Sequence, residues 1–319
     1  MANQSCGLAG GGKPQICAFS MAASLGFRLP RYRVSLAGMR IPLEDDFADV
    51  IGKAQRGLGF SDEKLAARAG IAVHDLLAVK GGKPVVAVIR RIARHLKLSP
   101  DALEVLALRR WYPLQPVFPR GFAMFNSAFG GGGGGGGGGR TVNSYLVWDP
   151  RSREAAAFDT GADCSAMLDT IAVEKLRVRH LFLTHTHEDH IADLRRLAAA
   201  TGAGVWSHER ERIDFPGARN FSEGAWFHVG DLAVKTLLTS GHSPGLTTFY
   251  VTGASWPLAV CGDSIFASSM GGSLTHYADQ LRNNVGKILP LPRDTVLAPG
   301  HGPLSTLAQE KKHNPFFAS

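Results

Sequence analysis

The chain has 319 residues, of which 45% are hydrophobic and 19% charged, and its formal net charge is +8. This size suits one large core with a smaller domain beside it. Its four cysteines, two of them within the first 40 residues, exclude a disulfide framework and favour a reducing cytoplasm. No apolar run reaches the length of a membrane-spanning helix, so membrane function is not expected.

The positive charge is unevenly distributed along the chain. Residues 1–40 hold five basic and no acidic residues, and residues 41–112 hold 12 basic against 9 acidic residues, a net of +3. The remaining +8 − 5 − 3 = 0 belongs to residues 113–319, where 18 basic residues balance 18 acidic ones. The larger, C-terminal part is therefore neutral, and its charge does not suggest a polyanionic substrate.

Residues 1–40 are rich in Gly, Ser, Ala and Arg and lack the apolar segment of a secretory signal. Such a composition also occurs in organellar transit peptides. We favour a disordered or mis-assigned extension, with Met39 as the working start of the protein just before the first folded domain.

Residues 41–112 form a helical domain by their pattern of apolar positions. Ser61 is expected to cap one helix, further helices are predicted over 73–79 and 85–96, and Ser99-Pro100 opens another, with proline at its first position. The Ala69-Gly70-Ile71 turn and the small residues before it resemble the phage-repressor type of helix-turn-helix.

DNA binding by this domain is possible but not favoured. The predicted second helix of the motif, 73–79, offers only His74 and Asp75 near its start, whereas base reading uses Arg, Lys, Asn or Gln. Lys80, Lys83 and Arg90 could contact phosphates, but a net charge of +3 is a weak electrostatic footprint. We expect a degenerate motif that serves packing or oligomerisation.

The third region, residues 113–319, contains ten consecutive glycines, Gly130–Gly139. A flexible run of that length spans about 18 Å root-mean-square. We interpret it as an expanded loop between the first two strands of the region, because Val117-Phe118 and 122–125 before it are strand-like. An interdomain linker is the alternative.

Four apolar runs in this region each end at groups that commonly bind metal ions. The runs 181–184, 234–238, 258–262 and 296–300 lead to His185, His242, Asp263 and His301, respectively. Each run predicts a short strand that is apolar on both faces, in a sheet covered on both sides. Loops that leave strand ends are where open sheets gather functional groups.

The first of these loops, His185-Thr186-His187-Glu188-Asp189-His190, is dense enough for two metal positions. His185 and His187 alternate to one side, while Asp189 and His190 can turn toward a second position. A single ion would leave several of the seven groups unpaired and buried, which is costly. The histidines outside this set are expected to be surface or satisfied core residues: His74, His95, His180, His208, His228 and His276.

The histidine-rich loop, followed in order by His242, Asp263 and His301, resembles the metallo-β-lactamase superfamily, and most of all its glyoxalase II-like hydrolases. The resemblance covers roughly residues 115–319 and includes Asp159-Thr160-Gly161, whose aspartate would orient the ligand loop. It implies an α/β fold, an αββα sandwich, here preceded by the small all-α domain. Helix-like segments at 164–176 and 191–200, the second ending at Gly202, agree with that fold.

By position, the resemblance assigns His185, His187 and His242 to a first metal ion and Asp189, His190 and His301 to a second, with Asp263 bridging. Two divalent ions are expected, zinc first, with iron or manganese as alternatives. A hydroxide held by both ions would attack a small thioester or ester, with Asp189 and Asp263 as the catalytic carboxylates.

The substrate is less defined, because Gly272 stands where relatives carry a basic residue that contacts glutathione. Tyr277, Arg282 and Lys287 lie downstream and are candidates for contacting an anionic substrate, although solvated surface charge also accounts for them. Two other functions stay open. One is persulfide oxygenation with a single iron, and the other is a DNA-binding regulator whose metal domain senses a metabolite or metal.

Overall fold

The computed structural model describes residues 40–116, 120–130, 140–254 and 256–318. The expectations about residues 1–39, and those about Val117-Phe118 and 131–139, fall outside these ranges. None of the described helices is both long enough and apolar enough to cross a membrane.

Five helices make up the N-terminal part of the described chain: α1 (Phe47–Gly57), α2 (Asp62–Ala69), α3 (Val73–Lys80), α4 (Val86–His95) and α5 (Pro100–Ala107). We call them the helical segment. Their ends follow local rules: the Ser61 side chain accepts from the backbone of Lys64, Ser99 caps a helix that begins with proline, and Gly70 ends α2 in the left-handed conformation. These boundaries match the predicted helices closely.

The rest of the described chain contains two six-stranded sheets with the orders β1-β2-β3-β4-β5-β6 and β12-β11-β10-β9-β8-β7. The first sheet comprises β1 (Phe122–Phe129), β2 (Arg140–Trp148), β3 (Glu154–Phe158), β4 (Arg177–Phe182), β5 (Gly204–His208) and β6 (Arg219–Phe221). The second comprises β7 (Trp226–Val229), β8 (Leu232–Leu238), β9 (Thr247–Thr252), β10 (Leu258–Gly262), β11 (Val296–Pro299) and β12 (Ser305–Thr306).

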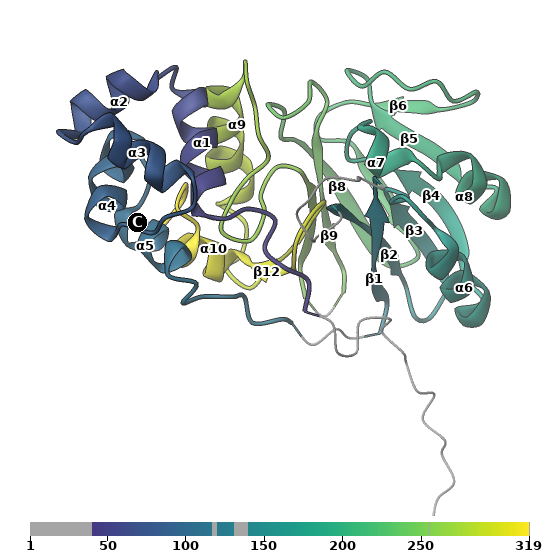
Figure 1. Ribbon diagram of the computed structural model, residues 1–319. Coiled ribbons are helices and arrows are strands. Elements are labelled where there is room, and N and C mark those ends of the chain that lie inside the picture. Colours follow the sequence, from purple (N-terminus) through teal and green to yellow (C-terminus); the bar gives the residue numbers. More distant parts are fainter. Residues whose placement is uncertain (1–39, 117–119, 131–139, 255, 319) are drawn as a thin grey trace, which may run out of the picture. The chain divides into compact units, whose positions relative to one another are not determined.

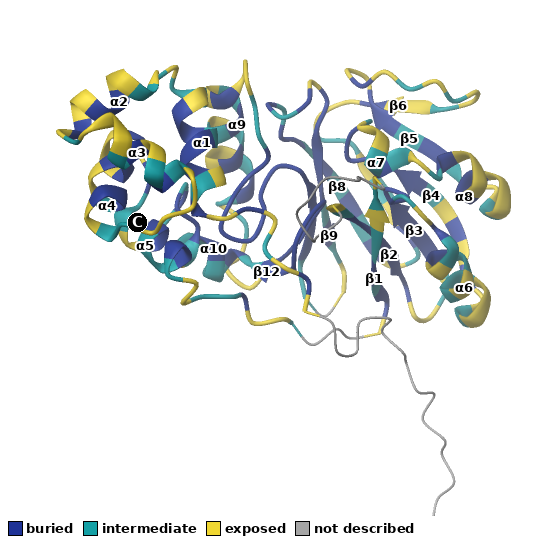
Figure 2. Cartoon of the chain, viewed as in Figure 1, coloured by how far each residue is buried: buried dark blue, intermediate teal, exposed yellow. Residues whose placement is uncertain are grey.

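Helices cover the outer faces of both sheets, which gives the four layers of an αββα sandwich (Figure 1). Beside the first sheet lie α6 (Ser165–Glu174), the single turn α7 (Glu188–Ile191) and α8 (Leu194–Thr201). Beside the second lie α9 (Tyr277–Asn283), the π-helix η1 (Asn284–Ile288) and α10 (Leu307–His313). Figure 2 shows the strands largely buried and the outer faces of α2, α6 and α8 exposed. The fold class is as predicted.

The core between the two sheets is rich in aromatic rings. Phe158 and Phe182 of the first sheet and Phe249 of the second are fully buried, and their ring centroids lie 4.9–5.4 Å apart. Contacts of this kind add to the free energy gained by burying the rings. They hold the two sheets together directly beneath the strand ends that carry the predicted ligands.

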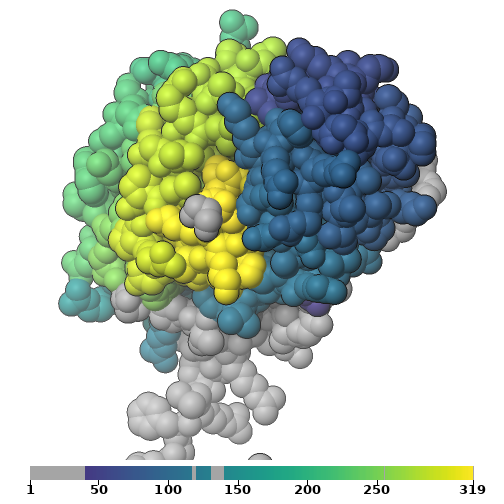
Figure 3. Space-filling model, turned by 90° about the vertical axis from the view of Figure 1, so that its left-hand side faces the viewer, coloured from purple at the N-terminus to yellow at the C-terminus, as the bar shows by residue number. Residues whose placement is uncertain are grey.

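The helical segment shares a hydrophobic cluster with the outer face of the second sheet. Ile51 and Leu76 belong to the same cluster as Ala259, Cys261 and Leu297 of β10 and β11. In the face shown in Figure 3, residues of the helical segment pack against the C-terminal residues. The Ser99 backbone N–H donates to the Pro315 carbonyl at 2.8 Å.

The strands that lead to the ligands differ in how completely they are buried. β10 and β11 are buried along their whole length, as predicted, but β8 alternates between buried and half-buried positions because one of its faces is only partly covered. The expectation of two apolar faces is therefore wrong for β8.

β1 and β2 pair antiparallel up to Phe129 and Arg140, so the glycine run connects the two strands of one hairpin and is not an interdomain linker.

Candidate metal centre

The seven predicted ligands come together at one end of the two sheets, on four loops. His185 and His187 follow β4, and His187 precedes the single helical turn α7, which contains Asp189 and His190. His242, Asp263 and His301 lie on the loops after β8, β10 and β11. The sequence predicts a loop at 188–191, whereas the structure has one helical turn there. The helical conformation brings Asp189 and His190 close to His301.

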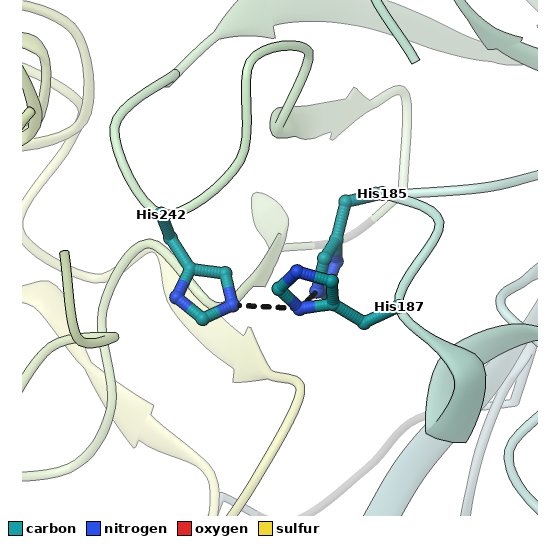
Figure 4. Close-up of side chains that lie close together, drawn as sticks. All are labelled: His185, His187 and His242. Carbon is teal, nitrogen blue, oxygen red and sulfur yellow. Dashed lines mark hydrogen bonds between the residues drawn. The ribbon is translucent and has the colours of Figure 1, made fainter. Parts of the chain in front are cut away.

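The first group consists of three imidazoles. Nδ1 of His187 lies 3.0 Å from Nε2 of His185 and 3.0 Å from Nε2 of His242 (Figure 4). His185 is fully buried, whereas His242 is half-buried and His187 is exposed. The exposed side of this group therefore leaves an approach from solvent.

The second group lies next to the first. Oδ2 of Asp189 is 3.3 Å from Nε2 of His301 and 3.9 Å from Nε2 of His190. Asp263 stands between the groups, with Oδ2 at 3.3 Å from Nε2 of His242 and 3.6 Å from Nε2 of His301, and Oδ1 at 3.4 Å from Nε2 of His190. A carboxylate in this place can contact two cations at once.

The outer ring nitrogen of four of these histidines contacts an oxygen that accepts a hydrogen bond. The pairs are His185 Nδ1 with Thr184 Oγ1 (3.0 Å), His190 Nδ1 with Asp159 Oδ2 (2.9 Å), His242 Nδ1 with the Gly272 carbonyl (2.7 Å) and His301 Nδ1 with the Thr141 carbonyl (2.7 Å). Thr184 accepts because its own hydroxyl hydrogen goes to Asp159. In the neutral ring the Nε2 lone pair of each histidine then points into the cluster, which is how metal-binding histidines are oriented.

The electrostatics of the cluster call for positive charge. Burial alone would lower the pKa of His190 and His301, but Asp263 and further carboxylates outweigh it, hold the pKa of His190 well above its usual range and raise that of His301 to about 9. Burial would raise the pKa of Asp263, yet His301 and His190 hold it well below its usual range. Protons on these imidazoles and a bound cation are alternative ways to balance the buried carboxylate.

Three further observations fit a divalent cation. Nε2 of His190 and Oδ1 of Asp263 are buried without a hydrogen-bond partner, which is expensive unless an ion supplies the missing interaction. A Cβ atom at Gly300 would lie 2.2 Å from Oδ1 of Asp263, so only glycine lets the loop after β11 come this close. Imidazole nitrogens and carboxylate oxygens together suit zinc, iron or manganese.

Asp159 lies behind the ligands, as the Asp-Thr-Gly motif predicted. Its carboxylate accepts from the backbone N–H of Thr184 and from the Thr184 hydroxyl, both at 2.7 Å, and from His190. Its φ of +56° is in the left-handed region, which aspartate tolerates better than most residues. Asp159 thus joins the residue before His185 to the ring of His190.

Sequence reasoning missed several residues that support the ligand loops. Glu211 accepts from the Thr186 hydroxyl (2.7 Å), the Ser243 hydroxyl (2.7 Å) and the Gly245 N–H (2.6 Å), and so connects the His185–His190 loop with the loop of His242. Asn143 donates to the carbonyls of Pro299 and Gly302, which flank His301. Glu211 lies in the charged run 209–212, which is typical of solvated surface, so the sequence carries no signal for its role.

The three substrate candidates have partners outside the cluster. Tyr277 is buried against Phe316, and a Cβ at Gly57 would lie 2.2 Å from its ring. Arg282 pairs with Asp279, and Lys287 donates to Glu223 and to the Leu238 carbonyl. None of their contacts among the described residues reaches the seven ligands. The downstream position in sequence does not bring these side chains to the site, because α9 directs Tyr277 and Arg282, and η1 directs Lys287, toward other partners.

The remaining histidines are not part of the cluster. His74 and His276 are exposed, as expected. His180 stacks on Phe182 and His208 is buried, but Nδ1 of His180 and Nε2 of His208 have no hydrogen-bond partner, so these two are not fully satisfied core residues. Cys261 is buried, and burial holds the pKa of its thiol well above the usual range, which agrees with a packing role.

A two-sheet αββα sandwich with this histidine and aspartate cluster at one end defines a class of metallohydrolases. The family model of the metallo-beta-lactamase superfamily matches residues 137–301, more than half of the chain. The chain belongs to that superfamily. The matched residues lie entirely after α5, so the family assignment does not extend to the helical segment.

Individual relatives agree with this assignment. An uncharacterized protein of Aquifex aeolicus is 30% identical over 200 residues, which cover 55% of this chain and 91% of that protein. Hydroxyacylglutathione hydrolase GloC of Haemophilus influenzae is 28% identical over 200 residues, covering 56% and 93%. For the hydroxyacylglutathione hydrolase of Pseudomonas entomophila, 29% identical over 159 residues, the chain spans only 60% of the relative's length. The crystal structure of BLEG-1 B3 metallo-beta-lactamase superposes with a TM-score of 0.54 at 26% identity, covering 61% of this chain and all of that one.

Proposed function

We propose that this protein is a dinuclear metal-dependent hydrolase of a small thioester or ester, similar to the hydroxyacylglutathione hydrolases. The observation that carries the proposal is the place of Asp263, within 3.3–3.6 Å of histidines from both ligand groups. The GloC relative of H. influenzae, which this chain covers almost completely, supports the substrate class.

In this proposal each ligand group would hold one ion. His185, His187 and His242 would bind the first ion and Asp189, His190 and His301 the second, while Asp263 would serve as a ligand to both. Zinc is our first choice, with iron or manganese compatible with the same ligands. Asp159, Thr184 and Glu211 keep the ligand loops in place through the hydrogen bonds described above.

When bound, the two cations supply an acidified water and polarise the scissile carbonyl. The chain's own residues prepare the site for that chemistry. The neighbouring histidines outweigh burial and hold the pKa of Asp189 and Asp263 below their usual range, so both carboxylates stay ionised at neutral pH and can accept a hydrogen bond from the attacking water. A thiolate leaving group needs little protonation, so a thioester demands no dedicated general acid.

The test combines metal content with activity on one sample. Protein purified without added metal is analysed for metal ions per chain, and the same sample is assayed for hydrolysis of S-lactoylglutathione. We expect two ions per chain and turnover. Asp263→Ala should keep the fold by circular dichroism but lose at least about 100-fold in rate, whereas the exposed Asp294→Ala serves as the matched control. A single iron per chain without hydrolysis would contradict the proposal and favour persulfide oxygenation.

A further inference from the structure

The loop after Asp263, residues 264–273, supports ligands of both groups; we call it the Asp263 loop. The Gly272 carbonyl accepts from Nδ1 of His242, and the Gly271 N–H donates to the Asp263 carbonyl at 3.1 Å. The ring of Phe266, earlier in the loop, meets the imidazole of His301 edge-on, with centroids 5.7 Å apart. A shift of this loop would therefore move His242, Asp263 and His301 together.

The helical segment contacts this loop through a largely buried ion pair between Asp45, which precedes α1, and Lys53, in the middle of α1. The ammonium group of Lys53 pairs with the carboxylate of Asp45, and their side chains are only 14% and 9% exposed. Lys53 also donates to the Met270 carbonyl at 2.9 Å, and the Ser269 hydroxyl donates to Asp45 at 2.5 Å. The pair thus binds two consecutive residues of the Asp263 loop, immediately before the glycines that contact His242.

The same side chain reaches the Phe266 and Gly272 positions. Nζ of Lys53 lies 5.2 Å from the centroid of the Phe266 ring, the ring that contacts His301. A Cβ atom at Gly272 would have one neighbour within 4 Å, Cε of Lys53 at 3.9 Å. Lys53 therefore occupies the space beside the loop where a side chain at position 272 would extend.

A second residue before α1 approaches the other side of the cluster. Oε2 of Glu44 lies 4.0 Å from Nδ1 of His301, and a Cβ atom at Gly302 would lie 3.2 Å from the Glu44 backbone nitrogen. The chain from Glu44 to Lys53 thus follows the Asp263 loop and the His301 loop together.

We propose that the Asp45–Lys53 ion pair is a positioning element of the metal centre, through which the helical segment fixes the Asp263 loop and with it His242, Asp263 and His301. This inference rests on the proposed metal site. A buried ion pair is weak evidence for stability, because apolar residues of similar volume often stabilise a fold equally well. Its directed hydrogen bonds to Met270 and Ser269 instead select one conformation of the loop.

The test measures zinc affinity rather than activity. Lys53→Met keeps the apolar stem of the side chain but removes the charge and the hydrogen bond to Met270. The matched control is Lys80→Met, which breaks the Lys80–Asp62 pair elsewhere in the helical segment. Zinc affinity of the full chain is determined by competition with a chromophoric chelator. We expect Lys53→Met to bind zinc about 10–100-fold more weakly, the usual effect of losing a group behind the ligands, and Lys80→Met to bind as the unsubstituted protein does.

Ser269→Ala provides a milder second variant, since it removes one hydroxyl and leaves the ion pair intact. It should weaken zinc binding several-fold without unfolding the protein, even if Lys53→Met does not fold. Unchanged zinc affinity in both variants would overturn the inference while leaving the proposed function in place. This holds even if the thermal unfolding midpoints of the variants fall. If the unsubstituted chain binds no zinc, iron or manganese, the proposed function and the inference both fail.

Discussion

Oδ2 of Asp159 and Nδ1 of His190 lie 2.9 Å apart, and their side chains are 3% and 0% exposed. The carboxylate accepts a hydrogen at this ring nitrogen, so the other nitrogen of His190 presents its lone pair to the second ligand group. The Thr184 hydroxyl donates to the same Oδ2. One buried oxygen therefore holds both ends of the His185–His190 loop.

The first prediction concerns Asp159→Asn. An asparagine keeps the shape and accepts the left-handed backbone, but its amide NH2 at the Oδ2 position would face two donors, Thr184 Oγ1 and His190 Nδ1. We expect His190 to move its hydrogen to Nε2 and the second ion to bind about 10–100-fold more weakly. Metal titration with the folded variant measures this. Asp193→Asn, whose carboxylate bonds Cys164 and Arg196, should retain the affinity.

The ligands could be located from the sequence because each one follows an apolar strand, and strand ends of a sandwich share an edge. The order of the motifs along the chain then predicted that these residues belong to one site. His185, His242, Asp263 and His301 lie on four different loops, yet all reach one cluster. Asp159 could be identified for the same reason, since its tripeptide follows β3 at that edge.

The supporting residues could not be found in this way, since their partners are distant in the chain. Asp45 bonds Ser269 across 224 positions, and Glu211 connects Thr186 with Ser243 through tertiary contacts alone. A charged residue of this kind has the same local pattern as a solvated one. The downstream position of Tyr277 suggested a role in substrate binding, but its place in the fold is decided by the close approach of Gly57.

Because the ligands form two groups, we expect that each of the two ions can be lost without the other. His242→Ala removes one of three imidazoles from the first group and leaves Asp189, His190 and His301 untouched. His301→Ala removes one ligand from the second group and leaves His185, His187 and His242 untouched. We expect about one ion per chain in each variant, measured by elemental analysis after dialysis, and two in the exposed control His276→Ala. Two ions retained in both variants would argue against the assignment of ligands.

Glu310 gives a prediction about pH and stability. It is fully buried, and its Oε2 accepts from the Ser268 N–H (3.0 Å) and from Asn314 Nδ2 (2.8 Å). Burial raises the pKa of its carboxyl to about 7, above the value of 4.5 expected in the unfolded chain. The folded state then binds more protons than the unfolded state between these values, so the free energy of unfolding falls as pH rises from 4.5 through 7.

Glu310→Gln keeps a carbonyl oxygen for both donors and cannot ionise. Relative to the unsubstituted protein, it should gain at most about 3 kcal/mol in free energy of unfolding between pH 4.5 and pH 8, with little further change above pH 8. Urea unfolding of the metal-free proteins across this range measures the difference. The exposed Glu209→Gln should show a small difference that does not vary with pH. A constant difference for Glu310→Gln as well would show that Glu310 is ionised throughout.

The last prediction is that the protein does not bind its own promoter DNA specifically; the helix-turn-helix resemblance itself stays a prediction. Two of the three cations proposed for phosphate contacts are already paired, Lys80 with Asp62 at 2.5 Å and Arg90 with Asp101 at 2.7 Å. The surface of α3 instead exposes Val73 (36%) and Leu77 (50%), which read no base edges with hydrogen bonds.

Fluorescence anisotropy with labelled promoter DNA at two salt concentrations measures this binding. We expect a Kd no tighter than about 10⁻⁶ M at physiological salt, equal for promoter and scrambled DNA, as for nonspecific contacts. Lys83→Ala removes an exposed cation from the turn after α3. The ratio of the affinities for promoter and scrambled DNA should stay at about one in this variant. Tighter binding to promoter than to scrambled DNA, weakened about equally for both sequences in Lys83→Ala, would instead assign the helical segment a role in regulation, because phosphate contacts position a protein on DNA while other groups read the sequence.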